Sequence, residues 1–443
     1  MKYSAYPAYK DSGVEWLGEI PAYWEKTRIK YVLHQIIDTE HKTAPFYPDG
    51  EYLVVRTSNV RNGQLVLEDA KYTDYEGFRE WTKRGKPEPG DILFTREAPA
   101  GEACLVPENL PLCLGQRMVL FRVNHQMLDE HYGIWSLYGG IAAEFITSLS
   151  QGATVAHFNM ADIANIPLLL PPLEEQAAIA SFLDRETAKI DALITKKERL
   201  IELLQEKRTA IISHAVTKGL DLTVPLKDSG VEWLGEIPAH WDVAPVYARY
   251  SVQLGKMLNQ EAVRGVASAP YLRNANIQWD RFDLTDLLEM DFDSSERRKY
   301  ALIPGDLLVC EGGEVGRTAI WQGELTECYF QKTVHRLRSL RNTEEGRFFF
   351  YVLYTAAKRG VFVADGSKNT IAHLTAEKLK KHRFAFPPYQ EQQAIASYLD
   401  RETAKIDALI AKIREGIEKL KEYRTALISS AVTGKIDVRE LTD

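Results

Sequence analysis

Apolar residues recur at steps of three and four along two stretches of the chain, residues 171–217 and 387–433. The stretches align without a gap at an offset of 216, and their spacing is that of a heptad seam on a long helix. Pro-Pro opens each stretch, and a glycine, Gly219 or Gly434, follows it, which is typical of a helix start and a C-cap. A helix of about 43 residues is roughly 65 Å long and cannot bury its seam against itself, so we expect the two to pair. The predicted seam is Ile179, Leu183, Ile190, Leu193, Leu200, Leu204 and Ile211 in the first stretch, and Ile395, Leu399, Ile406, Leu409, Ile413, Leu420 and Leu427 in the second.

A second repeat precedes each half of the chain. KDSGVEWLGEIPA occurs at residues 10–22 and again at 227–239, and Trp24 and Trp241 follow in register. Its dense apolar positions predict a motif that packs the neighbouring block onto the long helices, while a catalytic role for Asp11 or Glu15 is the lesser alternative. The chain is thus divided into docking motif (1–24), variable block (25–170), long helix (171–218), docking motif (219–241), variable block (242–386), long helix (387–433) and tail (434–443).

The two variable blocks share only short anchor segments. Residues 52–56 predict a short strand, and residues 270–277 match this region at an offset of 217. A Pro-Gly-Asp turn followed by a strand occurs at 89–94 and again at 304–309, each time before a loop, 95–103 or 310–319. We therefore predict one mixed α/β fold used twice, in a protein of the α+β class.

Composition narrows the possible ligands and compartments. The net charge is −7, with −5 in the first variable block and +3 in the second, so neither block has the basic balance of a free-standing DNA-binding domain. Four cysteines lie far apart, which argues against a zinc site or a disulfide framework and fits a reducing compartment. There is no apolar run of 18 residues and no apolar signal segment, so we expect a cytoplasmic protein without a membrane span.

Motifs that would carry a chemical step are missing from the sequence. There is no GxGxxG loop in a βαβ setting and no Walker A lysine loop, and the ten histidines are not spaced as a metal site. The glycines at 312, 313 and 316 follow a strand but enter no evident helix, which disfavours a phosphate cradle. We therefore predict a chain that is not an enzyme and binds no cofactor or metal itself.

Without catalytic motifs, recognition of a ligand is the function left to consider. Polar side chains that could bind one follow the strand ends in both blocks. Arginine and asparagine are the side chains that fork onto guanine and adenine edges in the major groove, although each single residue could equally be a solvated surface side chain. Such residues cluster at matching places in the two blocks, which makes the whole set a stronger candidate for a binding site than any single residue. The predicted DNA-binding residues are Arg56, Thr57, Ser58, Asn59, Arg61, Arg96, Gln116 and Arg117 in the first block, and Arg273, Asn274, Asn276, Arg317, Gln331, Lys332, Lys368 and Asn369 in the second.

A pattern near the start of each long helix resembles a known family. The pattern is PPxxEQxxIAxxLD, with Pro171-Pro172, Glu175-Gln176, Ile179-Ala180 and Leu183-Asp184 in one half, and Pro387-Pro388, Glu391-Gln392, Ile395-Ala396 and Leu399-Asp400 in the other. Together with the doubled layout it is similar to the specificity subunit of type I restriction–modification systems. The resemblance covers nearly the whole chain.

The resemblance implies a function and a set of partners. Each variable block would be a target-recognition domain that reads one half of a bipartite DNA sequence. The helices would pack as an antiparallel coiled coil that acts as a spacer, and pseudo-two-fold symmetry would let each half hold one methyltransferase subunit before restriction subunits join. S-adenosylmethionine, ATP and magnesium would be bound by those partner subunits, and adenine would be the methylated base.

Two other classes of function stay open on the residues alone. One is a scaffold in which two protein-binding domains are held on a coiled-coil spacer, because divergent blocks on a constant frame also suit two different protein ligands. The other is a self-contained methyltransferase or nuclease, which would need a cofactor or metal motif that the sequence lacks.

Overall fold

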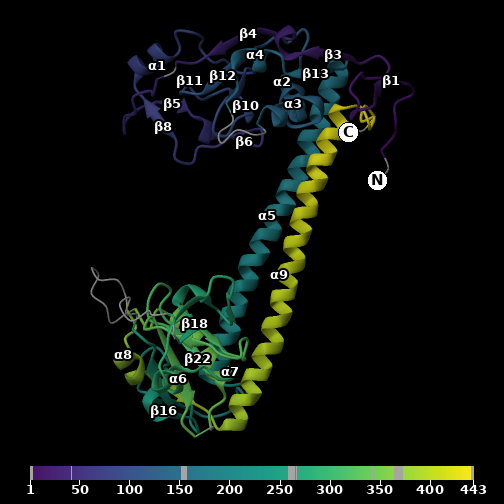
Figure 1. The fold of residues 1–443 in the computed structure, drawn as a ribbon. Coiled ribbons are helices and arrows are strands. Elements are labelled where there is room, and N and C mark those ends of the chain that lie inside the picture. Colours follow the sequence, from purple (N-terminus) through teal and green to yellow (C-terminus); the bar gives the residue numbers. More distant parts are fainter. Residues whose placement is uncertain are drawn as a thin grey trace. The chain divides into compact units, whose positions relative to one another are not determined.

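The computed structural model describes residues 3–40, 42–150, 157–257, 265, 267–341, 343–363 and 373–440. The chain divides into two compact units. The first unit combines Met1–Glu198 with Arg414–Asp443, and the second unit is Arg199–Ile413. Each unit therefore contains one docking motif, one variable block and a segment of each of two long helices, α5 (Leu173–Lys218) and α9 (Tyr389–Val432) (Figure 1).

The first unit is built on two small sheets. One is antiparallel, in the order β10-β9-β12-β4, and the other has the order β11-β5-β8 with a parallel β11-β5 pair. Its strands are β1 (Tyr9–Asp11), β2 (Glu19–Pro21), β3 (Glu25–Arg28), β4 (Leu33–Asp38), β5 (Tyr52–Val55), β6 (Val60–Arg61), β7 (Gln64–Leu65), β8 (Lys71–Thr73), β9 (Ile92–Thr95), β10 (Ala103–Leu105), β11 (Leu112–Leu114), β12 (Met118–Val123) and β13 (Pro167–Leu170). Its helices besides the long pair are α1 (Tyr75–Trp81), α2 (Glu130–Tyr138), α3 (Gly140–Ser150) and α4 (Met160–Ala164), with short 3-10 turns η1 (Ile29–Tyr31) and η2 (Thr57–Asn59).

The second unit repeats these sheets. The order β17-β25-β22-β23 corresponds to the first antiparallel sheet, and β21-β18-β24, with its parallel β18-β24 pair, corresponds to the other. Its strands are β14 (Leu226–Asp228), β15 (Glu236–Pro238), β16 (Asp242–Pro245), β17 (Tyr250–Leu254), β18 (Ser268–Leu272), β19 (Ile277–Gln278), β20 (Arg281–Phe282), β21 (Leu288–Asp291), β22 (Leu307–Cys310), β23 (Thr318–Ile320), β24 (Tyr329–Phe330), β25 (Val334–Ser339) and β26 (Arg383–Phe386). Its helices are α6 (Ser294–Tyr300), α7 (Gly346–Lys358) and α8 (Ala376–Lys381), with turns η3 (Val246–Ala248) and η5 (Asn274–Asn276). The prediction of one mixed α/β fold used twice is confirmed.

The core of each unit lies where its block meets the long helices. In the first unit, Trp24 and the stacked rings of Phe94 and Phe121 share one apolar cluster with Ile428 and Val432 of α9. In the second unit, a matching cluster packs the docking motif and α7 against both α5 and α9. Since residues from both long helices enter each core, neither helix depends on its partner helix alone for burial.

The long helices run antiparallel within each unit. In the first unit Arg424 Nε lies 3.0 Å from Asp191 Oδ1, and in the second unit Arg208 Nε lies 3.1 Å from Asp407 Oδ1. These ion pairs are equivalent at an offset of 216. In the second unit a Cβ at Gly219, just after α5, would also lie 3.3 Å from Glu391 Oε1 at the start of α9, so residue numbers rise on one helix as they fall on the other, as expected for the predicted antiparallel pair.

The predicted seam is correct at most positions and wrong at three. Leu193, Leu200 and Leu409 are 43–45% exposed and are not seam residues, whereas Ile410 and Ile417 are buried. At each of the three positions the next residue is the more buried one, because Ile194 and Ile201 are half-buried and Ile410 is buried, so the contact face lies one residue further along the helix. The remaining predicted seam residues are buried or half-buried: Ile179, Leu183, Ile190, Ile395, Leu399, Ile406, Ile413 and Leu427 are buried, and Leu204, Ile211 and Leu420 are half-buried.

Candidate nucleic-acid interface

A glutamate at the start of each long helix binds the docking motif. Glu175 is buried and accepts hydrogen bonds from Trp24 Nε1 at 3.1 Å and from the Tyr23 hydroxyl at 3.0 Å. In the second unit Glu391 accepts a hydrogen bond from Trp241 Nε1, also at 3.1 Å. The glutamate of the repeated Glu-Gln pair therefore anchors an indole rather than a ligand.

The far end of the other long helix lies against the same indole. A Cβ added to Gly434 would lie 3.3 Å from the Trp24 ring, and one added to Gly219 would lie 3.3 Å from the Trp241 ring. Both glycines have a positive φ, 69° and 77°, which side chains rarely adopt. Each docking motif thus sits where one long helix begins and the other ends, which is the predicted packing role.

The glutamine of the Glu-Gln pair caps a helix of the variable block. Gln176 accepts from Asp129 N at 2.9 Å and donates to the first proline carbonyl of its Pro-Pro pair at 2.8 Å. Gln392 accepts from Glu345 N at 2.9 Å and donates to the matching proline carbonyl at 2.9 Å. Asp129 and Glu345 are the N-caps of α2 and α7. Each glutamine therefore fixes the start of a block helix on a long helix.

The aspartate that ends the repeated pattern makes a third attachment. Asp184 accepts from Trp135 Nε1 at 2.8 Å and lies 3.1 Å from His131 Nδ1, and the hydrogen bond to Asp184 raises the pKa of His131. At the matched position Asp400 accepts from the Tyr351 hydroxyl at 2.7 Å. In both units the glutamate of the repeated pattern therefore attaches the docking motif to the long helix, and the glutamine and the aspartate attach the variable block.

The two asparagines at the matched turns are structural. Asn59 and Asn276 are 0% and 2% exposed, and each accepts from the backbone N–H three residues earlier, at 3.1 and 3.0 Å. Each amide also donates to a backbone carbonyl further along the chain, at 3.0 Å. Asn59 and Asn276 hold the η2 and η5 turns in shape, so the prediction that they bind DNA is wrong.

The arginines that precede these turns are half-buried at the same loop. Arg56 donates to the Asp69 carbonyl at 2.6 Å, and Arg273 donates to the Asp286 carbonyl at 2.7 Å and to its carboxylate at 2.8 Å. A base contact from either guanidinium would use its remaining donors.

The η2 and η5 turns each contact the loop that follows strand β9 or β22 of the same block. The Thr57 hydroxyl donates to the Ala98 carbonyl, and the Asn274 amide donates to the Gly312 carbonyl, both at 3.1 Å. Arg317 also donates to the Asn274 carbonyl at 2.8 Å. Among the described residues, Asn274 Oδ1 and Arg317 Nε are buried without a hydrogen-bond partner, which leaves an acceptor and a donor beside this contact.

The first-unit loop holds a cluster of charged side chains. Arg96 is 6% exposed and binds the Asp38 carboxylate at 2.9 and 3.0 Å, so it is an internal residue and not the predicted DNA contact. Glu97 binds Arg117 Nε at 2.9 Å and also binds His157 Nδ1. Arg117 remains exposed and has a φ of 73°.

The remaining predicted contacts fall into three groups. Ser58, Arg61 and Lys332 are exposed, and Gln116 and Gln331 are half-buried. Lys368 and Asn369 lie outside the described residues. We define the reading surface of each unit by three segments. They are the η2 or η5 turn with the residues that flank it, the loop after β9 or β22, and the residues just before β12 or β25. In the first unit it contains Arg56, Thr57, Ser58, Arg61, Gln116 and Arg117, and in the second it contains Arg273, Asn274, Arg317, Gln331 and Lys332.

The cysteines have no chemical role at these surfaces. All four are buried and unpaired, and burial raises the pKa of Cys310 to about 11 and of Cys104, Cys113 and Cys328 to about 12. They are therefore protonated at neutral pH and are poor nucleophiles and metal ligands. Within the described ranges no cluster of His, Cys, Asp and Glu could hold a metal ion, and no helix there is long and apolar enough to span a membrane.

Two segments of the chain match one family model, residues 21–203 and 251–419, and the model describes the type I restriction modification DNA specificity domain. The first matched segment contains the whole first variable block and the second contains most of the second variable block, and each includes most of one long helix. The chain belongs to this specificity family.

Curated relatives of this specificity-family chain match it along nearly its whole length. The putative type I restriction enzyme MjaX specificity subunit of Methanocaldococcus jannaschii is 24% identical and covers 96% of both chains. The type I restriction enzyme EcoKI specificity subunit of Escherichia coli is 21% identical over 95% of this chain and 90% of its own length.

Solved structures show the same fold. A chain from work on complex assembly and conformational transition of the type I restriction–modification system aligns with a TM-score of 0.69 and 19% identity, covering 94% of this chain and 99% of that one. The HsdS subunit from Thermoanaerobacter tengcongensis aligns with a TM-score of 0.57 and 17% identity, covering 94% and 98%. The predicted architecture of this specificity-family chain is therefore confirmed.

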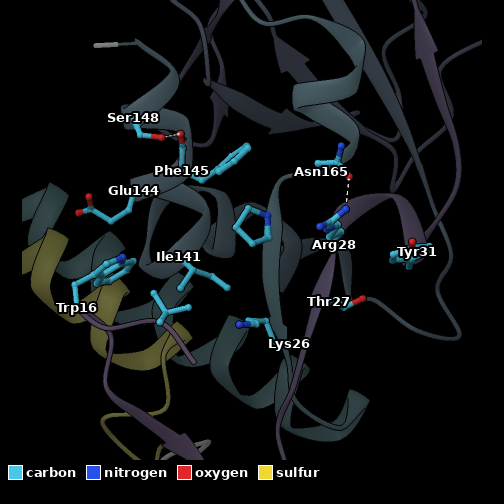
Figure 2. Close-up of a pocket in the computed structure, with 12 residues that line it drawn as sticks. Trp16, Lys26, Thr27, Arg28, Tyr31, Ile141, Glu144, Phe145, Ser148 and Asn165 are labelled. Atoms are coloured by element: carbon cyan, nitrogen blue, oxygen red, sulfur yellow. Dashed lines mark hydrogen bonds between the residues drawn. The ribbon is translucent and has the colours of Figure 1, made fainter. Parts of the chain in front are cut away.

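A groove in the first unit was not predicted. It encloses about 680 Å³ between the docking motif, β3, α3 and the end of α4, and it is lined by Trp16, Arg28, Tyr31 and Phe145 among others (Figure 2). Arg28 donates to Asn165 Oδ1 at 2.9 Å. The groove combines exposed aromatic rings with cations in a block of net negative charge. In the sequence, the alternating cations at positions 26, 28 and 30 are the pattern that could have indicated this groove.

Proposed function

We propose that this chain is the DNA sequence-specificity subunit of a type I restriction–modification complex, and that each unit reads one half of a bipartite target. The observation that carries the proposal is the contrast inside one chain. Glu175, Gln176 and Asp184 make the same three attachments as their partners at 391, 392 and 400, whereas the reading surfaces hold different side chains. A recognition code can diverge freely only on loops that the frame does not need.

The chain itself supplies recognition and no chemistry in this proposal. Two methyltransferase subunits dock on the two equivalent halves, and restriction subunits join them. S-adenosylmethionine, ATP and magnesium belong to those subunits, which act on cytoplasmic DNA. The net charge of −7 is consistent with a reader that partners help to hold on DNA.

The long helices set the unread gap between the half-sites. At 1.5 Å per residue, the 46 residues of α5 extend over roughly 69 Å, which is near two turns of DNA. Inserting about four residues after Thr195, with a matched insertion after Ala411 in α9, should lengthen the gap and leave both half-sequences intact. A constant gap would contradict the spacer role.

Domain exchange is the main test. The block 25–170 is replaced with the corresponding block of a relative, and the reconstituted complex methylates a DNA library randomised across both half-sites. The first half-site should change while the second stays the same. If the exchange rewrites the second half-site, or if no complex with a methyltransferase binds DNA sequence-specifically, the two-headed protein-binding scaffold becomes the better function.

Point substitutions test the reading surfaces, and the half-site read by the unaltered unit serves as the internal control. Arg117→Ala should affect recognition of the first half-site only, and Lys332→Ala that of the second only. A base contact costs discrimination at one position, about 1–3 kcal/mol, whereas a phosphate contact weakens all sequences alike and lowers the salt slope by about 1. Arg298→Ala, on the exposed face of α6, should change neither.

A further inference from the structure

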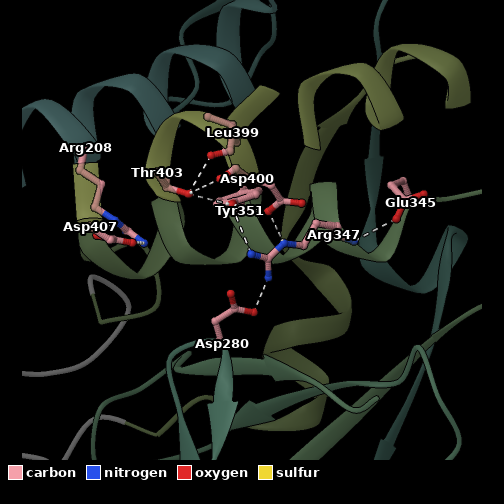
Figure 3. A network of polar contacts seen from close by, with 9 residues as sticks. All are labelled: Arg208, Asp280, Glu345, Arg347, Tyr351, Leu399, Asp400, Thr403 and Asp407. Carbon is pink, nitrogen blue, oxygen red and sulfur yellow. Dashed lines mark hydrogen bonds and ion pairs between the residues drawn. The ribbon is translucent and has the colours of Figure 1, made fainter. Parts of the chain in front are cut away.

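One difference between the units lies in the hairpin that follows the η2 turn in the first unit and the η5 turn in the second. In the second unit this hairpin is β19-β20, and its tip residue Asp280 binds the Arg347 guanidinium of α7 (Figure 3). Arg347 Nε also lies 2.6 Å from Asp400 Oδ1 on α9. A single guanidinium thus joins the hairpin tip to the long helix.

Other contacts hold Arg347 in this place. The guanidinium lies 4.8 Å from the Phe350 ring centroid and 5.0 Å from that of Tyr351, and its NH2 group is 3.3 Å from the Tyr351 hydroxyl. The Arg347 side chain is 26% exposed, so ring contacts and ion pairs share its surface. Arginine retains its planar fork in such a site and can bind two carboxylates at once.

The first unit has a different set of residues at the same positions. Gly63 stands where Asp280 is, and His131 stands where Arg347 is, at offsets of 217 and 216. His131 still binds Asp184, but the Gly63 N–H donates to the Tyr138 hydroxyl at 2.9 Å, within the variable block. A cleft of about 530 Å³ lies between this hairpin and the long-helix segments. Among the described residues of the first unit, no ion pair joins the hairpin to α5.

The hairpin is continuous with the reading surface. It begins directly after the η5 turn, whose Asn274 contacts the loop at Gly312. The adjoining Trp279 donates from Nε1 to Glu314 of the same loop at 2.7 Å. A restraint at Asp280 therefore acts on both the turn and the loop that carry the predicted contacts of the second unit.

The backbone of Asp280 supports a specific role for its carboxylate. Asp280 has a φ of 59°, in the left-handed region, where its counterpart Gly63 has a φ of 84°. A residue other than glycine at such a position carries a conformational cost. Here the aspartate gains the ion pair with Arg347 that a glycine could not form.

We propose that Arg347 is a positioning residue, which locks the second reading surface onto helix α9 through Asp280 and Asp400, and that the first reading surface lacks this lock. This inference rests on the proposed function. The second unit therefore reads its half-site from a fixed hairpin, whereas the first unit reads from a hairpin whose contacts, among the residues that the structure describes, are to its own block.

Exchange of the matched residues tests the lock in the full chain, assembled with its methyltransferase. Asp280→Gly and Arg347→His install the first unit's residues in the second unit, and Gly63→Asp with His131→Arg installs the reverse. A Cβ at Gly63 would meet its nearest atom at 3.5 Å, so the reverse exchange has room. Arg401→Ala removes an exposed arginine beside Asp400 and is the control.

Two readouts separate the lock from mere stability. Either second-unit substitution should lower discrimination at the second half-site roughly fivefold or more, leave the first half-site unchanged, and speed amide hydrogen exchange over residues 277–282. The two substitutions together should lower discrimination little more than either one alone. Asp280→Glu, which keeps a carboxylate, should retain most of the discrimination. The reverse exchange should slow amide exchange over residues 60–65.

The outcomes distinguish this inference from the proposed function. If Arg347→His lowers thermal stability but discrimination and amide exchange match those of Arg401→Ala, Arg347 is only structural and the inference is overturned. If both half-sites lose discrimination equally, the lock is not specific to the second unit, which also overturns it. If the unaltered complex shows no sequence preference at all, the proposed function fails, while the amide exchange still tests the lock.

Discussion

Replacing Gln392 with leucine tests whether the glutamine of the Glu-Gln pair holds a recognition domain on its long helix. Gln392 is 1% exposed and forms hydrogen bonds of 2.9 Å with Glu345 N, Pro387 O and a carboxylate oxygen of Glu344. Leucine fills a similar volume and forms none of these. The two backbone groups lose this partner in a buried place, whereas Arg249 still binds the other oxygen of Glu344 at 3.0 Å.

The magnitude follows from the groups left unpaired. A buried polar group that loses its partner costs about 1–3 kcal/mol, so the two backbone groups together cost about 2–6 kcal/mol. For a unit of this size that loss lowers the Tm of the second unit by about 4–24 °C.

Scanning calorimetry of the full chain measures the shift, with Gln393→Leu as the control. Gln393 is the next residue on α9, is exposed, and donates to the Tyr389 hydroxyl at 3.3 Å. Gln176→Leu should produce the equivalent loss in the first unit. If Gln392→Leu unfolds at the same temperature as Gln393→Leu, the capping argument is refuted.

Three further predictions follow from burial and backbone geometry. Ile190→Ala should cost about 2–4 kcal/mol in urea unfolding because Ile190 is 7% exposed, whereas Leu193→Ala should cost under about 1 kcal/mol, and equal losses would contradict the corrected seam. Burial lowers the pKa of His335, so the folded chain keeps this imidazole neutral and should lose stability as the pH falls below about 6.5, where the unfolded chain protonates. His335→Val, which installs the residue at the matched position 119, should flatten that loss in urea titrations between about pH 7.5 and 5.5, and parallel curves for both proteins would refute it. Gly434→Ala should destabilise the first unit because its Cβ would lie 2.3 Å from Pro21 at a φ of 69°, while Gly416→Ala, inside α9, should stabilise by about 0.5–1 kcal/mol, with thermal melts deciding both signs.

The elements that follow from local spacing could be predicted from the sequence. The long helices begin after their Pro-Pro pairs and end beside Gly219 and Gly434, and the Pro-Gly-Asp turn does precede a buried strand in both blocks. These features depend on a few neighbouring residues, and the repeat provides each of them twice. The seam failed at Leu193, Leu200 and Leu409 because an isoleucine directly follows each of these leucines, and the apolar pattern alone does not decide which of the two side chains faces the partner helix.

The reading surface was predictable only in part, because one side-chain type serves two purposes. An asparagine after a strand can read adenine or cap a turn, and in this chain Asn59 and Asn276 cap turns. Arg96 pairs with Asp38, which lies 58 residues away in the sequence, so no local pattern could show that its guanidinium is occupied. The role of the Glu-Gln pair likewise depends on partners in other elements, such as Trp24 and Asp129.

The make-up of the first unit has a consequence for how the protein is synthesised. That unit needs Leu427, Ile428 and Val432 of α9 to complete its core, and its docking motif needs Gly434, although its own block is translated first. The second unit is a contiguous stretch, 199–413, and all its residues are synthesised before α9 is finished. On a nascent chain, the half that is made last is therefore the half that can be finished first. A chain interrupted shortly after residue 413 would carry a complete second reading head beside an amino-terminal half with an open apolar face, a product that chaperones and proteases would encounter.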